Sequence, residues 1–132
     1  MQSCEPCKFP EAMSVSVTFE NNALRYTELS CGCKQTLVGA DGAQFEIGMP
    51  VTIDPTTGIV SPDPTGIAPN FWGISLVSKL SSAADNSVTV IRHGVVSWQD
   101  VASAAGLNAN DPAVYWPIAV AMRPSGIFLE NI

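Results

Sequence analysis

The four cysteines are the residues of this chain whose spacing is most suggestive of chemistry. They form two close pairs, Cys4-x-x-Cys7 and Cys31-x-Cys33. Four thiolates brought together in this way could hold a structural zinc ion, although the second pair has one spacer residue where zinc sites usually have two or more. One or two disulfides, or four reduced thiols packed as small apolar side chains, account for the same pattern. Cys4, Cys7, Cys31 and Cys33 are therefore the candidate metal ligands, with the alternatives left open.

A thiol–disulfide oxidoreductase is a less suitable interpretation of Cys4-Glu5-Pro6-Cys7. That chemistry places the first cysteine at a helix N-terminus, where its thiolate is stabilised. No strand pattern precedes this motif and no helical pattern follows it. The region also lacks a nearby general base, so each interpretation of the four cysteines gives them a structural role.

The remaining titratable residues do not form a catalytic pattern. His93 is the only histidine, and a catalytic histidine needs an orienting carboxylate and a nucleophile beside it. Arg92-His93-Gly94 instead indicates a turn between two strands. The 12 carboxylates are spread singly along the chain, and no glycine-rich phosphate-binding loop is present. We expect a protein that is not an enzyme and that needs no cofactor beyond a possible structural zinc.

Charge and composition favour an assembled protein. Only 14% of the residues are charged, whereas 46% are hydrophobic, and about 25% charged is typical of globular domains. A surface so poor in charge is expected to turn apolar area towards a partner. The net charge is −6 and the six cations are scattered, which argues against direct binding to nucleic acid or to anionic membranes.

No membrane or secretory segment is expected. The N-terminal residues lack a basic stretch followed by an apolar one. The longest apolar runs, residues 71–77 and 114–122, are much shorter than the roughly 20 residues that span a bilayer. We therefore expect a protein made in a cytoplasm.

Ten glycines and ten prolines divide the chain into short apolar segments, a pattern typical of mainly β proteins. Alternation predicts a hairpin over residues 13–29, and Asp54-Pro55-Thr56-Thr57-Gly58 predicts the turn of a second hairpin over residues 44–60. One short helix is expected at about residues 98–105, with Gly106 as its C-cap. The other predicted strands cover residues 71–77, 88–91, 95–98, 114–122 and 126–129.

The organisation predicted from these elements is a single domain with an N-terminal extension. Residues 1–38 form an arm or hairpin that holds all four cysteines, and residues 39–132 form a β-rich domain. Trp72, Trp98 and Trp116 lie in the second part. Tryptophans are either core residues or anchors of an interface between subunits, so these three are the candidates for a trimer interface.

An ordered series of motifs in the second part resembles a known family. The series comprises Pro50-Val51-Thr52-Ile53-Asp54, Thr56-Thr57-Gly58-Ile59-Val60, Trp72-Gly73-Ile74-Ser75-Leu76-Val77, Ala84-Asp85-Asn86-Ser87-Val88-Thr89-Val90 and Gly94-Val95-Val96-Ser97-Trp98-Gln99-Asp100-Val101. In this order and spacing, residues 49–132 resemble the lambda-type head decoration (cement) proteins of tailed phages.

This resemblance implies a β-clip-like domain that assembles as a homotrimer on the outer capsid surface of a phage virion. There it would bind the major capsid protein and stabilise the expanded head. It also implies that the N-terminal arm, Met1 to Val38, contacts the capsid by adding a strand to a capsid protein edge. The predicted hairpin and four cysteines depart from the short polar arms usual in the family. The alternative function is a virion module that binds host cells or glycans through exposed tryptophans.

Overall fold

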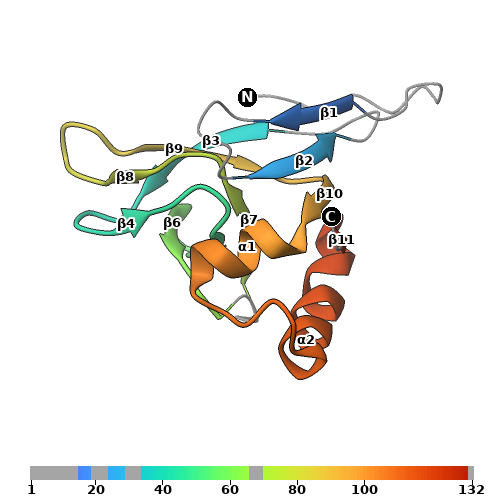
Figure 1. Ribbon diagram of the computed structural model, residues 1–132. Coiled ribbons are helices and arrows are strands. Elements are labelled where there is room, and N and C mark those ends of the chain that lie inside the picture. Colours follow the sequence, from blue (N-terminus) through green and yellow to red (C-terminus); the bar gives the residue numbers. More distant parts are fainter. Residues whose placement is uncertain (1–14, 19–23, 29–33, 66–69, 131–132) are drawn as a thin grey trace.

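The computed structural model of the protein describes residues 15–18, 24–28, 34–65 and 70–130. Within these ranges strands predominate, and two α-helices and one 3-10 helix occur in the C-terminal part (Figure 1). The elements in chain order are β1 (Val15–Thr18), β2 (Arg25–Glu28), β3 (Lys34–Gly39), β4 (Gln44–Phe45), β5 (Pro50–Ile53), β6 (Ile59–Pro62), β7 (Phe71–Ser75), β8 (Lys79–Leu80), β9 (Ser87–Ile91), β10 (Gly94–Ser97), α1 (Trp98–Ala105), α2 (Pro112–Met122), η1 (Arg123–Ser125) and β11 (Ile127–Glu130).

A closed five-stranded barrel forms one half of the molecule, in the order β3-β6-β5-β7-β9. The β5–β6 hairpin confirms the turn predicted at residues 54–58. Asp54 Oδ1 accepts a hydrogen bond from the Thr56 N–H at 2.8 Å, and Gly58 takes the left-handed conformation with φ of 75°. Alternate side chains of the strands point inwards. The barrel core consists of Val51, Val60, Val88 and Val90 from its strands together with Phe45 from β4, which packs against them.

The second sheet has the order β1-β2-β10-β11. Antiparallel pairing of β1 with β2, which sets Val15 opposite Glu28, confirms the hairpin predicted over residues 13–29. Strand β2 also pairs antiparallel with β10, and β10 pairs parallel with β11. The predicted boundary between residues 38 and 39 falls inside β3, which pairs with both β6 and β9 of the barrel.

Helix α1 has the bounds predicted for the single expected helix. Its N-cap is Ser97, whose hydroxyl accepts a hydrogen bond from the Asp100 N–H at 3.3 Å. Gly106 ends it in the left-handed conformation, with φ of 73°, as a C-cap glycine does. The face formed by Trp98, Val101 and Ala102 is buried in a second core that also includes residues of β7, β10, α2 and β11.

The strand predicted over residues 114–122 is wrong, because these residues lie in helix α2. Asp111 caps the helix by accepting a hydrogen bond from the Ala113 N–H at 2.9 Å. Pro112 follows at the first helical position, where its fixed φ suits a helix and its missing N–H is not needed. The fold nevertheless remains that of a small, mainly β single domain. The β-clip-like description stays a prediction.

Candidate functional site

Helix α2 is unusually apolar for a helix at a protein surface. No residue from Pro112 to Met122 carries a charge, and the helix buries only Ile118 and Met122. A helix that is apolar on every side is normally covered on every side. Here Trp116 is 59% exposed and Val120 is 65% exposed. One face of α2 therefore lacks a cover within the described part of the chain.

The exposed positions of α2 form a continuous stripe. They recur in pairs four residues apart, which places them one above another on the same side of a helix. The stripe consists of Pro112, Ala113, Trp116, Pro117, Val120 and Ala121. Its regular spacing shows that the exposed apolar area is a property of the whole helix and not of one stray side chain.

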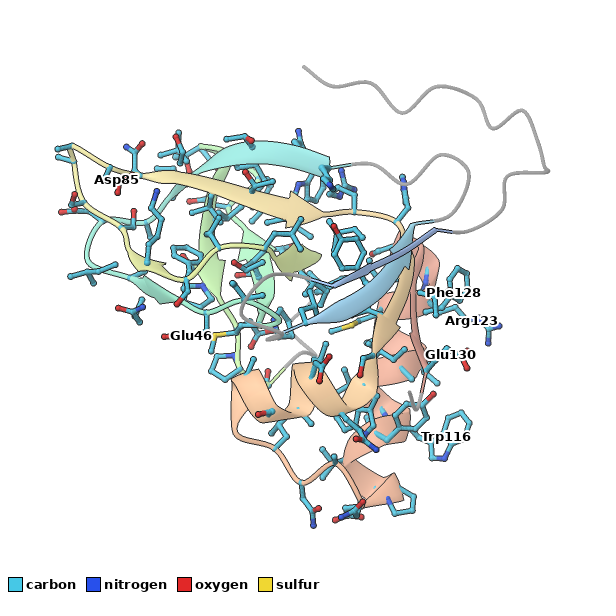
Figure 2. All side chains as sticks on the ribbon, turned by 45° about the horizontal axis from the view of Figure 1, so that its top comes forward. Glu46, Asp85, Trp116, Arg123, Phe128 and Glu130 are labelled. Carbon is cyan, nitrogen blue, oxygen red and sulfur yellow. The ribbon has the colours of Figure 1, made fainter. Side chains whose placement is uncertain are left out.

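A groove of about 590 Å³ lies between this helix and β11. Apolar side chains form most of its lining, and we call its principal residues the α2–β11 face: Trp116, Val120, Arg123, Phe128 and Glu130. Figure 2 shows the side chains of Trp116, Arg123, Phe128 and Glu130 on the same side of the molecule, away from Asp85 and the β8–β9 loop that carries it. The volume is within the range of about 300–1,000 Å³ that is common for binding pockets.

Tyr115 fixes the geometry of this face. Its hydroxyl donates a hydrogen bond to the Leu129 carbonyl oxygen at 2.8 Å and so ties α2 to β11. Its ring makes edge contacts with Trp98, at a centroid distance of 5.4 Å, and with Trp116, at 4.9 Å. Edge-to-face contacts of this kind orient aromatic rings. Trp116 is thus positioned before any partner arrives, which lowers the conformational entropy that binding would cost.

Two opposite charges line the groove, those of Arg123 and Glu130. The Arg123 guanidinium lies over the Phe128 ring at 5.3 Å from its centroid. Glu130 also lines an adjoining hollow of about 400 Å³ together with Asp111 and Trp116. Neither Arg123 nor Glu130 forms an ion pair within the described part of the chain.

The three tryptophans predicted as interface candidates occupy different environments. Trp98 is only 2% exposed, and its Nε1 donates to the Ala109 carbonyl oxygen at 2.9 Å. It is a core residue and offers no surface to a second copy. Trp72 is half-buried, donates to Gln35 Oε1 at 3.1 Å, and is covered by the Arg92 guanidinium 3.8 Å from its ring centroid. Of the three, Trp116 is the one that presents an exposed ring.

The candidate zinc ligands Cys4, Cys7, Cys31 and Cys33 lie outside the described residues, so the three interpretations of the cysteines stay open. Among the residues that the structure does describe, no group of three or more His, Cys, Asp or Glu side chains comes together. No described helix is both long and apolar enough to cross a membrane.

His93 lies at the bend between β9 and β10 and packs against Gly126. A methyl group at Gly126 would meet its imidazole. This agrees with the turn predicted at Arg92-His93-Gly94. The close packing accounts for a glycine at position 126, where the backbone also adopts a φ of 92°.

No protein-family model matches this chain, and no curated protein matches it either. The resemblance to head decoration proteins therefore depends on the motifs of residues 49–132 alone.

Sequence reasoning identified Trp116 but missed Val120, Arg123, Phe128 and Glu130. One signal was available: a charge-free run of eleven residues bounded by Asp111 and Arg123. Had Asp111-Pro112 been interpreted as a helix start, this run would have predicted an apolar helix with more apolar surface than one small domain buries. The contribution of β11 depends on tertiary packing and left no local signal.

Proposed function

We propose that the protein is a structural capsid decoration (cement) protein, which binds the outer surface of a phage head as a homotrimer and stabilises the expanded capsid. The observation that carries this proposal is the α2–β11 face. A preordered apolar groove on a charge-poor domain supports a role in assembly, in which copies or partners cover it. The motif series of residues 49–132 supports the choice of the phage head as the place of assembly.

The barrel suits such a role because it is a rigid body. Each of its five strands has a neighbour on both sides, and a closed barrel exposes no unpaired strand edge. A protein that braces a shell against internal pressure needs a body that does not deform when its contacts are loaded. In this proposal the barrel supplies rigidity, and the surfaces around the second sheet make the contacts.

Residues 1–38 are proposed to bind the major capsid protein. In the described part of the chain, β1 stands at the end of its sheet and pairs with β2 alone. A strand at a sheet edge offers unpaired backbone groups, and an additional strand from a partner can complete them. Three such edges on one trimer would act together, because the second and third contacts form within an already bound particle.

A second candidate function is adhesion to a glycan, and one observation favours it. The exposed Trp116 ring lies beside a hollow lined by Asn110, Asp111 and Glu130. An aromatic ring that stacks on a sugar and polar side chains that bind its hydroxyls would suit such a ligand. The cement role is preferred because the larger part of the face, towards Val120 and Phe128, is apolar.

The test is the mass of the purified protein in solution, followed by co-sedimentation with expanded empty heads. We expect a trimer that sediments with the heads and raises the temperature at which they are disrupted, compared with heads alone. Failure to bind heads, together with binding to immobilised glycans or host cells, would replace the cement role by the adhesion role. Failure in both assays would remove both proposals.

A further inference from the structure

We infer that the α2–β11 face is covered by a second copy of this chain, and that Arg123 of one copy pairs with Glu130 of the next. This inference deepens the proposed function, on which it rests for the expectation of an oligomer, because it names the contact that joins the copies. It assigns no residue to the contact with the capsid.

Charge balance at the groove is the first argument for a second copy. The chain carries a net charge of −6, so two copies repel each other over most approaches. Among the described residues that line the groove, Arg123 and Glu130 are the only charged ones. The charges of this described lining balance, so two acidic copies can approach here without net repulsion between these side chains. A strongly basic partner would gain more from the acidic surface elsewhere.

The position of the two charges is the second argument. Arg123 lies beside Phe128, and Glu130 lies further along the same side of the molecule, between Arg123 and Trp116 (Figure 2). In a closed ring of three copies, Arg123 of each copy meets Glu130 of its neighbour. Two opposite charges on one face therefore make it complementary to the same face of another copy.

Shape is the third argument. The face contains both a groove and two projecting apolar side chains, Trp116 and Val120, which are 59% and 65% exposed. A tryptophan held in place by a neighbouring ring is the kind of residue that dominates interface energies when it enters a partner's pocket. In the copy–copy contact, Trp116 and Val120 of one copy enter the groove of the other, and the ion pairs close the rim.

A charge exchange tests the pairing. Arg123→Glu and Glu130→Arg each place like charges in contact and are expected to weaken association at least about tenfold. The double variant, R123E with E130R, restores opposite charges and is expected to recover most of the lost association. The measurement is sedimentation equilibrium over a range of protein concentrations. The matched control is Asp41→Arg, which changes the net charge as Glu130→Arg does at an exposed turn and is expected to leave association unchanged.

Two alanine substitutions, one on the face and one away from it, test the apolar part of the contact. They also keep the inference testable if a charge variant does not fold. Trp116 and Leu80 are both 59% exposed, but Leu80 lies on β8 and not on this face. Trp116→Ala is expected to weaken association by about tenfold or more, because truncated interface anchors commonly cost that much. Leu80→Ala is expected to have no effect on association. Circular dichroism and thermal unfolding confirm that each variant is folded.

Three results would overturn the inference: a wild-type chain that stays monomeric at all concentrations, single charge variants that associate like the wild type, or a folded double variant that does not recover. Head binding is measured separately on the same samples. An oligomer that obeys the charge exchange but ignores heads would refute the proposed function and leave the inference standing. An oligomer that binds heads and is indifferent to all these substitutions would refute the inference and leave the proposed function standing.

Discussion

The barrel core buries its apolar side chains, whereas the α2–β11 face leaves several of its apolar side chains exposed. Phe45, Val51 and Val60 of the barrel core are fully buried, whereas Trp116 and Val120 on the face are mostly exposed. The barrel closes on itself, while the face leaves an apolar groove open. We infer from this difference that the barrel core determines the stability of the domain and that the α2–β11 face determines its assembly. Substitutions should therefore change one property and leave the other unaltered.

The largest expected effect is the loss of the largest side chain in the barrel core, that of Phe45 on β4. Phe45 is 0% exposed and packs with Val51, Val60, Val88 and Val90. Phe45→Ala is expected to lower the free energy of unfolding by about 3–5 kcal/mol, measured by urea denaturation. Trp116→Ala should change that free energy by less than about 0.5 kcal/mol in the monomer, as surface substitutions usually do. If both variants were equally destabilised, the division between the two regions would fail.

Gly73 in β7 gives a smaller effect on the same side of the comparison. A methyl group at this position would lie 2.6 Å from the carbonyl oxygen of Ile91, in the neighbouring strand β9. Gly73→Ala must separate the two strands and is expected to cost about 2–3 kcal/mol, measured by thermal or urea unfolding.

The control for Gly73→Ala is Gly42→Ala, where nothing lies within 4 Å but φ is 81°. It should cost only about 1 kcal/mol, from the left-handed backbone alone. A loss at Gly73 no larger than this would show that the β7–β9 contact yields easily and that the barrel is less rigid than we infer.

Single strands and the β5–β6 turn of the barrel could be predicted from the sequence because their signals are local, whereas β3 and the closure of the barrel were not predicted. Asp54, Pro55 and Gly58 specify a turn by their own backbone preferences, and alternating side chains indicate the strands on either side. The buried strand predicted at residues 71–77 agrees with β7, in which Phe71, Gly73, Ile74 and Ser75 are buried. Helix α1 could also be predicted from the sequence, since Gly106 marks its C-terminal end.

Helix α2 could not be separated from a strand by its apolar pattern. A run that is apolar at every position has no period, and Pro117 inside the run argued further against a helix. The signal that decides is Asp111-Pro112, a capping residue followed by a proline at the first helical position. The candidate site was only partly predictable for a related reason: Arg123 and Glu130 belong to one face only because β11 lies beside α2.

Asp111→Ala probes the boundary between the two regions, because it acts on α2 and not on the barrel. It removes the oxygen that accepts the Ala113 N–H, and it is expected to lower the free energy of unfolding by about 1 kcal/mol, measured by urea denaturation. Asp111→Asn keeps a capping oxygen and should retain most of the stability. Equal losses in the two variants would show that the charge of Asp111, and not its capping hydrogen bond, supports the start of α2.

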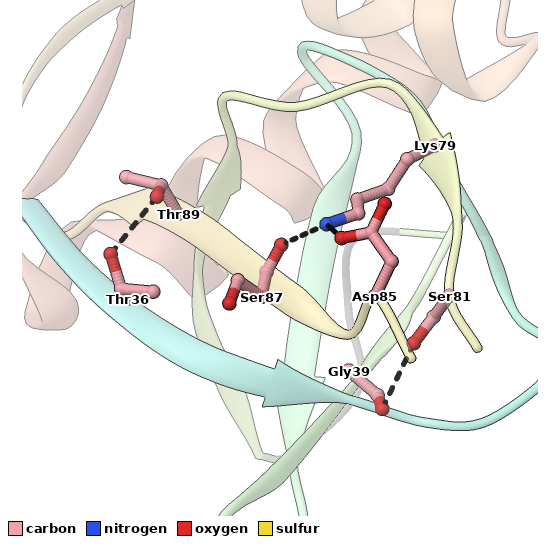
Figure 3. Close-up of polar contacts among 7 residues, drawn as sticks. All are labelled: Thr36, Gly39, Lys79, Ser81, Asp85, Ser87 and Thr89. Atoms are coloured by element: carbon pink, nitrogen blue, oxygen red, sulfur yellow. Dashed lines mark hydrogen bonds and ion pairs between the residues drawn. The ribbon is translucent and has the colours of Figure 1, made fainter. Parts of the chain in front are cut away.

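The smallest expected effect concerns the polar contacts around the loop between β8 and β9 (Figure 3). Lys79 Nζ lies 2.5 Å from Asp85 Oδ1 and also donates to the Ser87 carbonyl oxygen at 2.7 Å. The Asp85 side chain is 70% exposed, so water and salt screen the pair. Asp85→Asn leaves the Lys79–Ser87 bond in place and is expected to change the free energy of unfolding by no more than about 0.5–1 kcal/mol.

The same variant also tests where assembly takes place. Because Asp85 lies on the side of the molecule away from Trp116 and Arg123 (Figure 2), Asp85→Asn should leave the association constant unchanged in sedimentation equilibrium. In 1 M salt the small difference in unfolding free energy between wild type and variant should nearly vanish, since the Debye length falls to about 3 Å. A marked loss of association in Asp85→Asn would mean that the β8–β9 loop takes part in the contact between copies, and that assembly is not confined to the α2–β11 face.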